Sequence, residues 1–199
     1  MAGEITHIVY GKKIFDRNKL TDWPKFLVGT IFPDIRYVAN IDRGLLHDCN
    51  TSEALIPRIN AFESGKYVHS LVDEKRDLFI NSRNVYNFLP HQKSFSAALK
   101  LYEDALTYEL FSGWQEVIDA LDSTYEEAFV YGVNEKTVKK WHNFFKKYFK
   151  KKPDEKQWLE LGNFLGFNYS DYTDLMKAIK IIKSKPEVLA IIKGTYKNI

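Results

Sequence analysis

The chain has 199 residues, of which 45% are hydrophobic and 15% aromatic, and it carries a formal net charge of +3. This composition supplies a packed core and excludes an intrinsically disordered chain, and the charge is too small to indicate a specific nucleic-acid partner. The single cysteine, Cys49, excludes an internal disulfide framework. Because the N-terminus does not resemble a secretory signal and no apolar run reaches the roughly 18–20 residues that span a bilayer, the sequence predicts a cytoplasmic protein.

The first expected helix covers residues 6–20, where apolar side chains recur among charged ones. Thr6 could serve as its N-cap. His7 would then occupy the first helical position, near a terminus that need not be packed.

A second, mostly apolar helix is expected over residues 21–32, since a polar cap and an early proline mark its start. Gly29 would allow a neighbouring backbone to approach closely. Pro33 should end this helix and push Phe32 out of the α region. Asp34 would therefore emerge from the core on a rigid turn.

Residues 38–50 read as loop with a short helix, and another short helix is expected from residue 51. A central helix follows over residues 65–80. Its predicted apolar stripe consists of Val68, Leu71, Val72, Leu78 and Phe79. The row beside that stripe, expected at the border between core and solvent, consists of His69, Asp73 and Arg76.

Helical periodicity continues through the rest of the chain, and strand alternation is nearly absent. Further helices are expected over residues 94–110, 114–131, 134–150, 154–165 and 172–193, the last interrupted at Pro186. No heptad persists and no repeat is found. The sequence therefore predicts one all-α domain over residues 1–199, an irregular multi-helix bundle, with a metal-site half over 1–82 and a divergent helical half over 83–199.

Three histidines and two aspartates within the first 73 residues are candidate metal ligands: His7, Asp34, His47, His69 and Asp73. His69 and Asp73 are four residues apart on the central helix, so both side chains would lie on one face and could converge on one ion. Neutral imidazole and carboxylate are ligands that zinc accepts. A bound ion would bring the pKa of a coordinated water from about 16 to about 7. Binding should weaken as the pH falls through about 6, because the imidazoles must be neutral.

Each candidate also has an ordinary interpretation. His7 could be a plain residue at a helix start, and Asp34 could cap the next turn through its own backbone. His47 with Asp48, and His69 with Asp73, could be surface pairs.

The candidate ligands fall within a longer pattern of motifs over about residues 1–80. The pattern consists of Thr6-His7, Phe26-Leu27-x-Gly29-x-x-x-Pro33-Asp34-Ile35, His47 and Gly65-x-x-x-His69-x-x-x-Asp73. This order and spacing resemble the zinc-dependent phospholipase C family, all-α hydrolases related to single-strand nucleases of the P1 type. The resemblance implies that all five residues are zinc ligands, that Asp34 also acts as catalytic base or orients the attacking water, and that Asp73 can bridge two ions.

The chain lacks some ligands of that family, which lowers the number of metal ions expected in the centre. Family members with three zinc ions also use the mature N-terminal amine and a later His together with His-x-x-x-Glu. This chain begins with Met1, and after the central helix only His91 and His142 remain, without the second helical pair. The resemblance therefore implies one or two zinc ions, or another divalent transition metal. Arg36 and Arg76 could bind the substrate phosphate bidentately, or could be solvated surface residues.

Two other interpretations stay open. His47-Asp48 resembles the metal-binding dyad of HD-type phosphohydrolases, which are also all-α, with His7 and Asp73 as nominal partners. Alternatively, the chain is a non-catalytic helical scaffold or binding module with a reduced metal site. Lysines alternate with aromatic residues over 136–152, a pattern that fits peripheral contact with an anionic membrane or an ordinary core-facing helix with a basic exposed side.

The leading prediction is a metal-dependent phosphoester hydrolase, similar to phospholipase C, in which metal-activated water attacks phosphorus. Its expected substrate is a small phosphoester or a phospholipid, and no specific nucleic acid is predicted.

Overall fold

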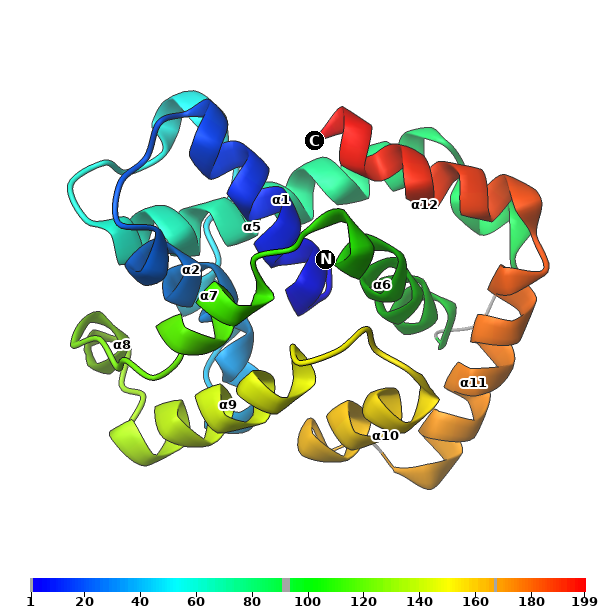
Figure 1. Ribbon diagram of the computed structural model, residues 1–199. Coiled ribbons are helices and arrows are strands. Elements are labelled where there is room, and N and C mark those ends of the chain that lie inside the picture. The colour runs from blue at the N-terminus through cyan, green and yellow to red at the C-terminus, as the bar shows by residue number, and fades with distance from the viewer. Residues whose placement is uncertain (1, 91–93, 167) are drawn as a thin grey trace.

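A computed structural model describes residues 2–90, 94–166 and 168–199, and the regular secondary structure of these residues is helical (Figure 1). The all-α prediction is therefore confirmed. The α-helices are α1 (Glu4–Arg17), α2 (Trp23–Ile31), α3 (Arg36–Ala39), α4 (Arg43–Leu46), α5 (Ala61–Ser82), α6 (Ser94–Thr107), α7 (Trp114–Ala120), α8 (Glu127–Val130), α9 (Glu135–Tyr148), α10 (Glu155–Phe164), α11 (Tyr169–Lys183) and α12 (Pro186–Asn198). The 3₁₀ turns are η1 (Pro33–Ile35), η2 (Glu53–Leu55), η3 (Val85–Phe88) and η4 (Tyr108–Leu110). No helix in these ranges combines the length and apolarity needed to cross a bilayer.

Two glycines bring α2 and α5 into backbone contact. A Cβ atom at Gly29 would lie 2.1 Å from the carbonyl oxygen of Phe62, and one at Gly65 would lie 1.9 Å from the carbonyl oxygen of Phe26. Both distances are far below van der Waals contact, so only glycine permits this approach. The expected close approach at Gly29 is confirmed, and its partner is the helix that carries His69.

The first helix starts earlier than predicted, and its N-terminal end is buried. Gly3 is the N-cap of α1, and Thr6 lies inside the first turn, so the prediction that Thr6 caps the helix is wrong. The side chain of Asp104, on α6, instead accepts hydrogen bonds from the Thr6 amide (2.8 Å) and the Thr6 hydroxyl (2.7 Å). This end of α1 lies in the middle of the molecule beside α6 (Figure 1), and His7 is fully buried.

The chain does not leave the α region before Pro33. Phe32 has φ −65° and ψ −40°, so the prediction that the proline displaces it was wrong. The missing proline amide is accommodated by a tighter turn: η1 follows α2 directly and leads into α3. Asp34 is nevertheless delivered from the end of a buried helix, as expected.

Helix α5 begins at Ala61, four residues before the predicted start, because the Asn60 side chain caps it by accepting from the amides of Phe62 and Glu63. The apolar stripe is not as predicted: Leu78 is 71% exposed. The row of His69, Asp73 and Arg76 is buried rather than at the border with solvent, because α1 packs against α5 and because Arg76 pairs with the buried Glu103 of α6.

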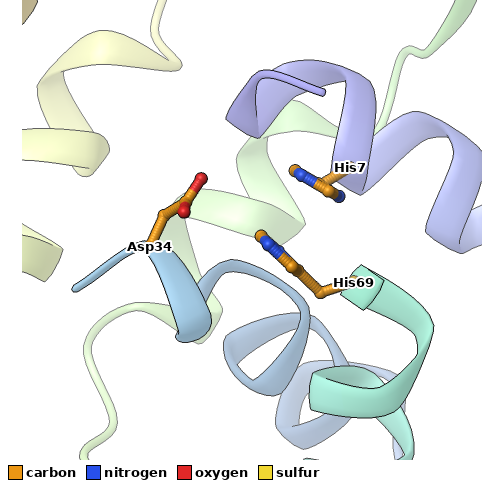
Figure 2. A group of neighbouring side chains, drawn as sticks. All are labelled: His7, Asp34 and His69. Carbon is orange, nitrogen blue, oxygen red and sulfur yellow. The ribbon is translucent and has the colours of Figure 1, made fainter. Parts of the chain in front are cut away.

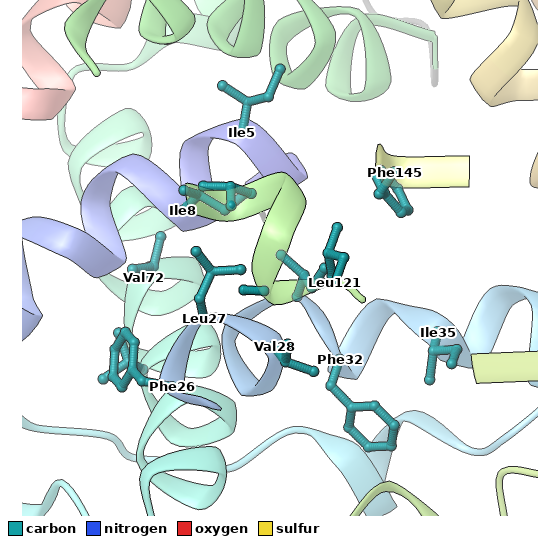
Figure 3. Close-up of a cluster of buried hydrophobic side chains, with 14 of the residues drawn as sticks. Ile5, Ile8, Phe26, Leu27, Val28, Phe32, Ile35, Val72, Leu121 and Phe145 are labelled. Carbon is teal, nitrogen blue, oxygen red and sulfur yellow. The ribbon is translucent and has the colours of Figure 1, made fainter. Parts of the chain in front are cut away.

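The helices of the second half lie near their predicted ranges, except that 114–131 is divided into α7 and α8. Core residues from both halves pack together around α1, α2 and α5 (Figure 3). On α9 the aromatic side chains Trp141, Phe145 and Tyr148 point into this core. The exposed face of α9 is therefore the lysine-bearing one, with Phe144 half-buried beside it.

Candidate metal centre

Five side chains from the N-terminal half converge at one buried point. His7 comes from α1, Asp34 from η1, and His47 from the residue that ends α4, while His69 and Asp73 lie one turn apart on α5. Figure 2 shows the rings of His7 and His69 lying parallel, with the carboxylate of Asp34 beside them. The structure thus brings together all five residues that the sequence singled out, each between 0% and 7% exposed.

The ligand atoms are spaced as donors to a common ion would be. The Nε2 atoms of His47 and His69 are 3.1 Å apart, and Asp73 Oδ2 lies 3.9 Å from the first and 4.0 Å from the second. Ligands about 2.1 Å from a tetrahedral zinc ion are about 3.4 Å from one another. His47, His69 and Asp73 therefore form one candidate ligand set, and His7, Asp34 and His69 form a second that shares His69.

A backbone carbonyl fixes which nitrogen of His69 can bind metal. His69 Nδ1 lies 2.9 Å from the carbonyl oxygen of Thr30, which can only accept, so Nδ1 carries the proton. Nε2 then holds the one available lone pair and points at His47. This is the arrangement by which a partner of the other ring nitrogen orients a metal-binding imidazole. With a single free nitrogen, His69 serves one ion at a time, so the two ligand sets overlap.

Several buried polar atoms of the centre have no hydrogen-bond partner among the described residues. They are both ring nitrogens of His7, Oδ1 of Asp34 and Nδ1 of His47. Burying such atoms without a partner costs about 1–3 kcal/mol each, so a group that satisfies them is expected. A divalent transition metal fits this donor set of imidazoles and carboxylates.

Burial sets the protonation of the centre. It lowers the pKa of His47 to about 4 and that of His69 well below its ordinary value. Burial raises the pKa of Asp34, opposed by Lys100 and His7. Burial also acts to raise the pKa of Asp73, but the contact with His7, at 3.4 Å, outweighs it and lowers the pKa. The imidazoles of His47 and His69 are therefore neutral at pH 7, and proton competition with a metal should begin nearer pH 4 than the pH 6 expected for exposed histidines.

Residues that the sequence did not single out surround the centre. The amide of Ala2 donates to Asp73 Oδ1 over 2.5 Å. Glu4 is buried one turn before His7, and its pKa is raised by burial and by the nearby Asp34 and Asp104. Glu4 could have been found from its i, i+3 spacing to His7, but Asp104 is 97 residues from that histidine in the chain and gave no local signal.

The two predicted phosphate-binding arginines lie in different surroundings. Arg36 Nε is 3.7 Å from Asp34 Oδ1, so this side chain borders the centre. Arg76 is 2% exposed, and its Nε donates to Glu103 over 2.6 Å in a buried ion pair. Phosphate binding by Arg36 stays a prediction, while Arg76 as placed is directed at Glu103 rather than at the five ligands.

Two other candidates lie outside the centre. The carboxylate of Asp48 pairs with Lys66 at 3.0 Å, and Asp48 belongs to neither ligand set. His142 is a core residue whose Nδ1 donates to the Leu121 carbonyl over 3.1 Å. His91 lies outside the described residues.

Comparison with protein-family models, with curated proteins and with solved structures found no match for this chain.

Proposed function

We propose that the chain is a metal-dependent phosphoester hydrolase of the zinc phospholipase C type, with one zinc ion held by His47, His69 and Asp73. The observation that supports the proposal is the convergence of five buried donors, with Thr30 orienting His69. Three protein ligands leave a zinc ion open to water and substrate. A bound ion would act as Lewis acid toward a phosphoryl oxygen and supply a nucleophile near neutral pH.

In this proposal Asp34 is the general base. Its carboxylate lies 3.9 Å from His47 Nε2, so it borders the ion without belonging to the same ligand set. Because burial raises its pKa, Asp34 is a stronger base than an exposed aspartate. His7 stacks on His69, with ring centroids 3.7 Å apart, and holds that ring in place. Arg36, beside Asp34, is a positive group for the phosphate.

The test is hydrolysis of bis(p-nitrophenyl) phosphate and p-nitrophenyl phosphate by the zinc-loaded protein. We expect p-nitrophenol release that a chelator stops and added zinc restores. D34N should keep its zinc and lose about 100-fold or more in kcat, the usual range for a missing base. Zinc-loaded protein that hydrolyses neither ester, nor phosphatidylcholine in mixed micelles, contradicts the proposal.

A second function is favoured by the depth of the centre. His7 and His69 are fully buried and the other three ligands nearly so, and closed sites are typical of structural zinc. In that case an ion bound by His7, Asp34 and His69 would tie α1, η1 and α5 together in a non-catalytic module, located in the cytoplasm as the sequence predicts. Any membrane contact of 136–152 would then rest on its exposed lysines. Loss of helical circular dichroism on zinc removal would support this alternative, whereas a folded, inactive apoprotein would support the hydrolase.

A further inference from the structure

A cavity of about 110 Å³ separates the candidate metal centre from the C-terminal helices. Its charged lining residues are Glu4, Asp34, Asp104 and Lys100. Its opposite wall comes from α10 and α11 and consists of Trp158, Leu161, Leu165 and Leu175. A cavity with charged groups at one end and apolar side chains at the other fits a ligand divided in the same way.

Lys100 is the cation of this cavity. It lies half-buried on α6, and it forms no ion pair with the residues that the structure describes. Its positive charge acts to lower the pKa of Asp34 and of Glu4, against the effect of burial. An ammonium group near a metal centre that is not bound in an ion pair can reach an anionic oxygen of a ligand.

The charges at the polar end make anion binding depend on the metal. Glu4, Asp34 and the neighbouring Asp73 are carboxylates that repel a phosphate. A divalent ion together with Lys100 supplies three positive charges opposite them. A phosphate group is therefore expected at this end only when the ion is bound.

The volume limits the apolar part of the ligand. An apolar cavity of about 150 Å³ accepts the six carbons of benzene, so this smaller cavity, part of which is polar, accepts at most about four carbons. We propose that the substrate of the centre is a phosphoester with a short apolar group of up to about four carbons, that Lys100 binds its phosphate, and that the apolar group occupies the cavity between α6, α10 and α11. This inference rests on the proposed function, because the phosphate must lie at the metal centre.

Calorimetric binding of alkylphosphonates, which are not hydrolysed, to the zinc-loaded protein tests the inference. Affinity should rise about fourfold per methylene from methylphosphonate to butylphosphonate, as buried methylenes require, and change little from butyl to octyl. K100M should weaken every member about tenfold or more, whereas K100R should stay near the parent protein. A97L, which enlarges a side chain of the cavity wall, should remove the dependence on chain length and leave methylphosphonate binding unchanged.

Equal affinity for methyl- and butylphosphonate, or unchanged binding by zinc-loaded K100M, overturns the inference. The alkyl series on the unaltered protein decides the matter even if K100M fails to fold. Hydrolysis of p-nitrophenyl esters together with a flat alkyl series overturns this inference alone. A protein that binds no zinc overturns the proposed function and this inference together.

Discussion

Replacing Gly65 with alanine places a methyl group where α5 and α2 are in backbone contact. The new Cβ would lie 1.9 Å from the Phe26 carbonyl oxygen and 2.8 Å from the Thr30 amide nitrogen. Both obstacles are backbone atoms, so no side-chain rotation relieves the clash and α2 must move away. Overpacking of this kind costs about 1–3 kcal/mol and occasionally more, while alanine in a helix recovers about 1 kcal/mol over glycine. Because both obstacles are backbone atoms, we take the upper end of that cost, about 3 kcal/mol, and expect G65A to lose about 2 kcal/mol of unfolding free energy.

The same displacement should reach the metal centre. Thr30, which lies on the displaced helix, accepts the hydrogen bond that orients His69. Moving this carbonyl removes the partner of Nδ1, and loss of such partners typically costs 10–100-fold in metal affinity. G65A should therefore bind zinc at least about tenfold more weakly than the parent protein.

The assay is urea unfolding followed by circular dichroism, combined with competitive zinc titration of the folded protein. G194A is the matched control, because it makes the same substitution inside α12, where the new Cβ would lie 3.4 Å from a Phe79 ring carbon. This control should be neutral or slightly more stable. If G65A is as stable as G194A and binds zinc normally, the account of the α2–α5 contact is refuted.

Two further predictions concern buried charge. E103Q should lower the unfolding free energy by about 3 kcal/mol, because it removes the buried carboxylate from Arg76 and leaves this guanidinium only the half-exposed Asp77. A change below about 1 kcal/mol in urea unfolding would show that the buried ion pair is unimportant. In the metal-free protein, burial lowers the pKa of His47 to about 4. Between about pH 4 and pH 6.5 the unfolded chain therefore binds more protons than the folded protein. The unfolding free energy should fall by up to about 3 kcal/mol as the pH is lowered through that range. In H47N this part of the pH dependence should disappear, and an unchanged profile would contradict the assignment.

The parts of the centre that sequence predicts are those set by local rules. The i, i+4 spacing of His69 and Asp73 places them on one helix face whatever the fold, and the proline after α2 marks where Asp34 leaves the core. Gly29 likewise predicted a close contact with another helix, although the sequence did not indicate which helix it would be.

The parts that sequence misses depend on contacts between distant segments. His7 was expected near an unpacked terminus, but Asp104 holds the first turn of α1 inside the molecule. Arg76 was expected at the border between core and solvent. It is buried instead, because it forms an ion pair with the buried Glu103 of α6. No local pattern predicted a role for Lys100, because it comes near the candidate metal centre only through the packing of α6 against α1. Local periodicity carries no information about such pairings, and tertiary packing decides them.

The most direct test of the metal centre is the zinc content of the purified protein and of its variants, measured by mass spectrometry after dialysis against micromolar zinc. The parent protein should retain one zinc ion per chain, and H142Q, altered at a buried histidine outside the centre, should retain it too. Joint replacement of His69 and Asp73 by alanine should abolish zinc binding while helical circular dichroism largely persists. A parent protein that holds no divalent transition metal at micromolar concentration would contradict the account.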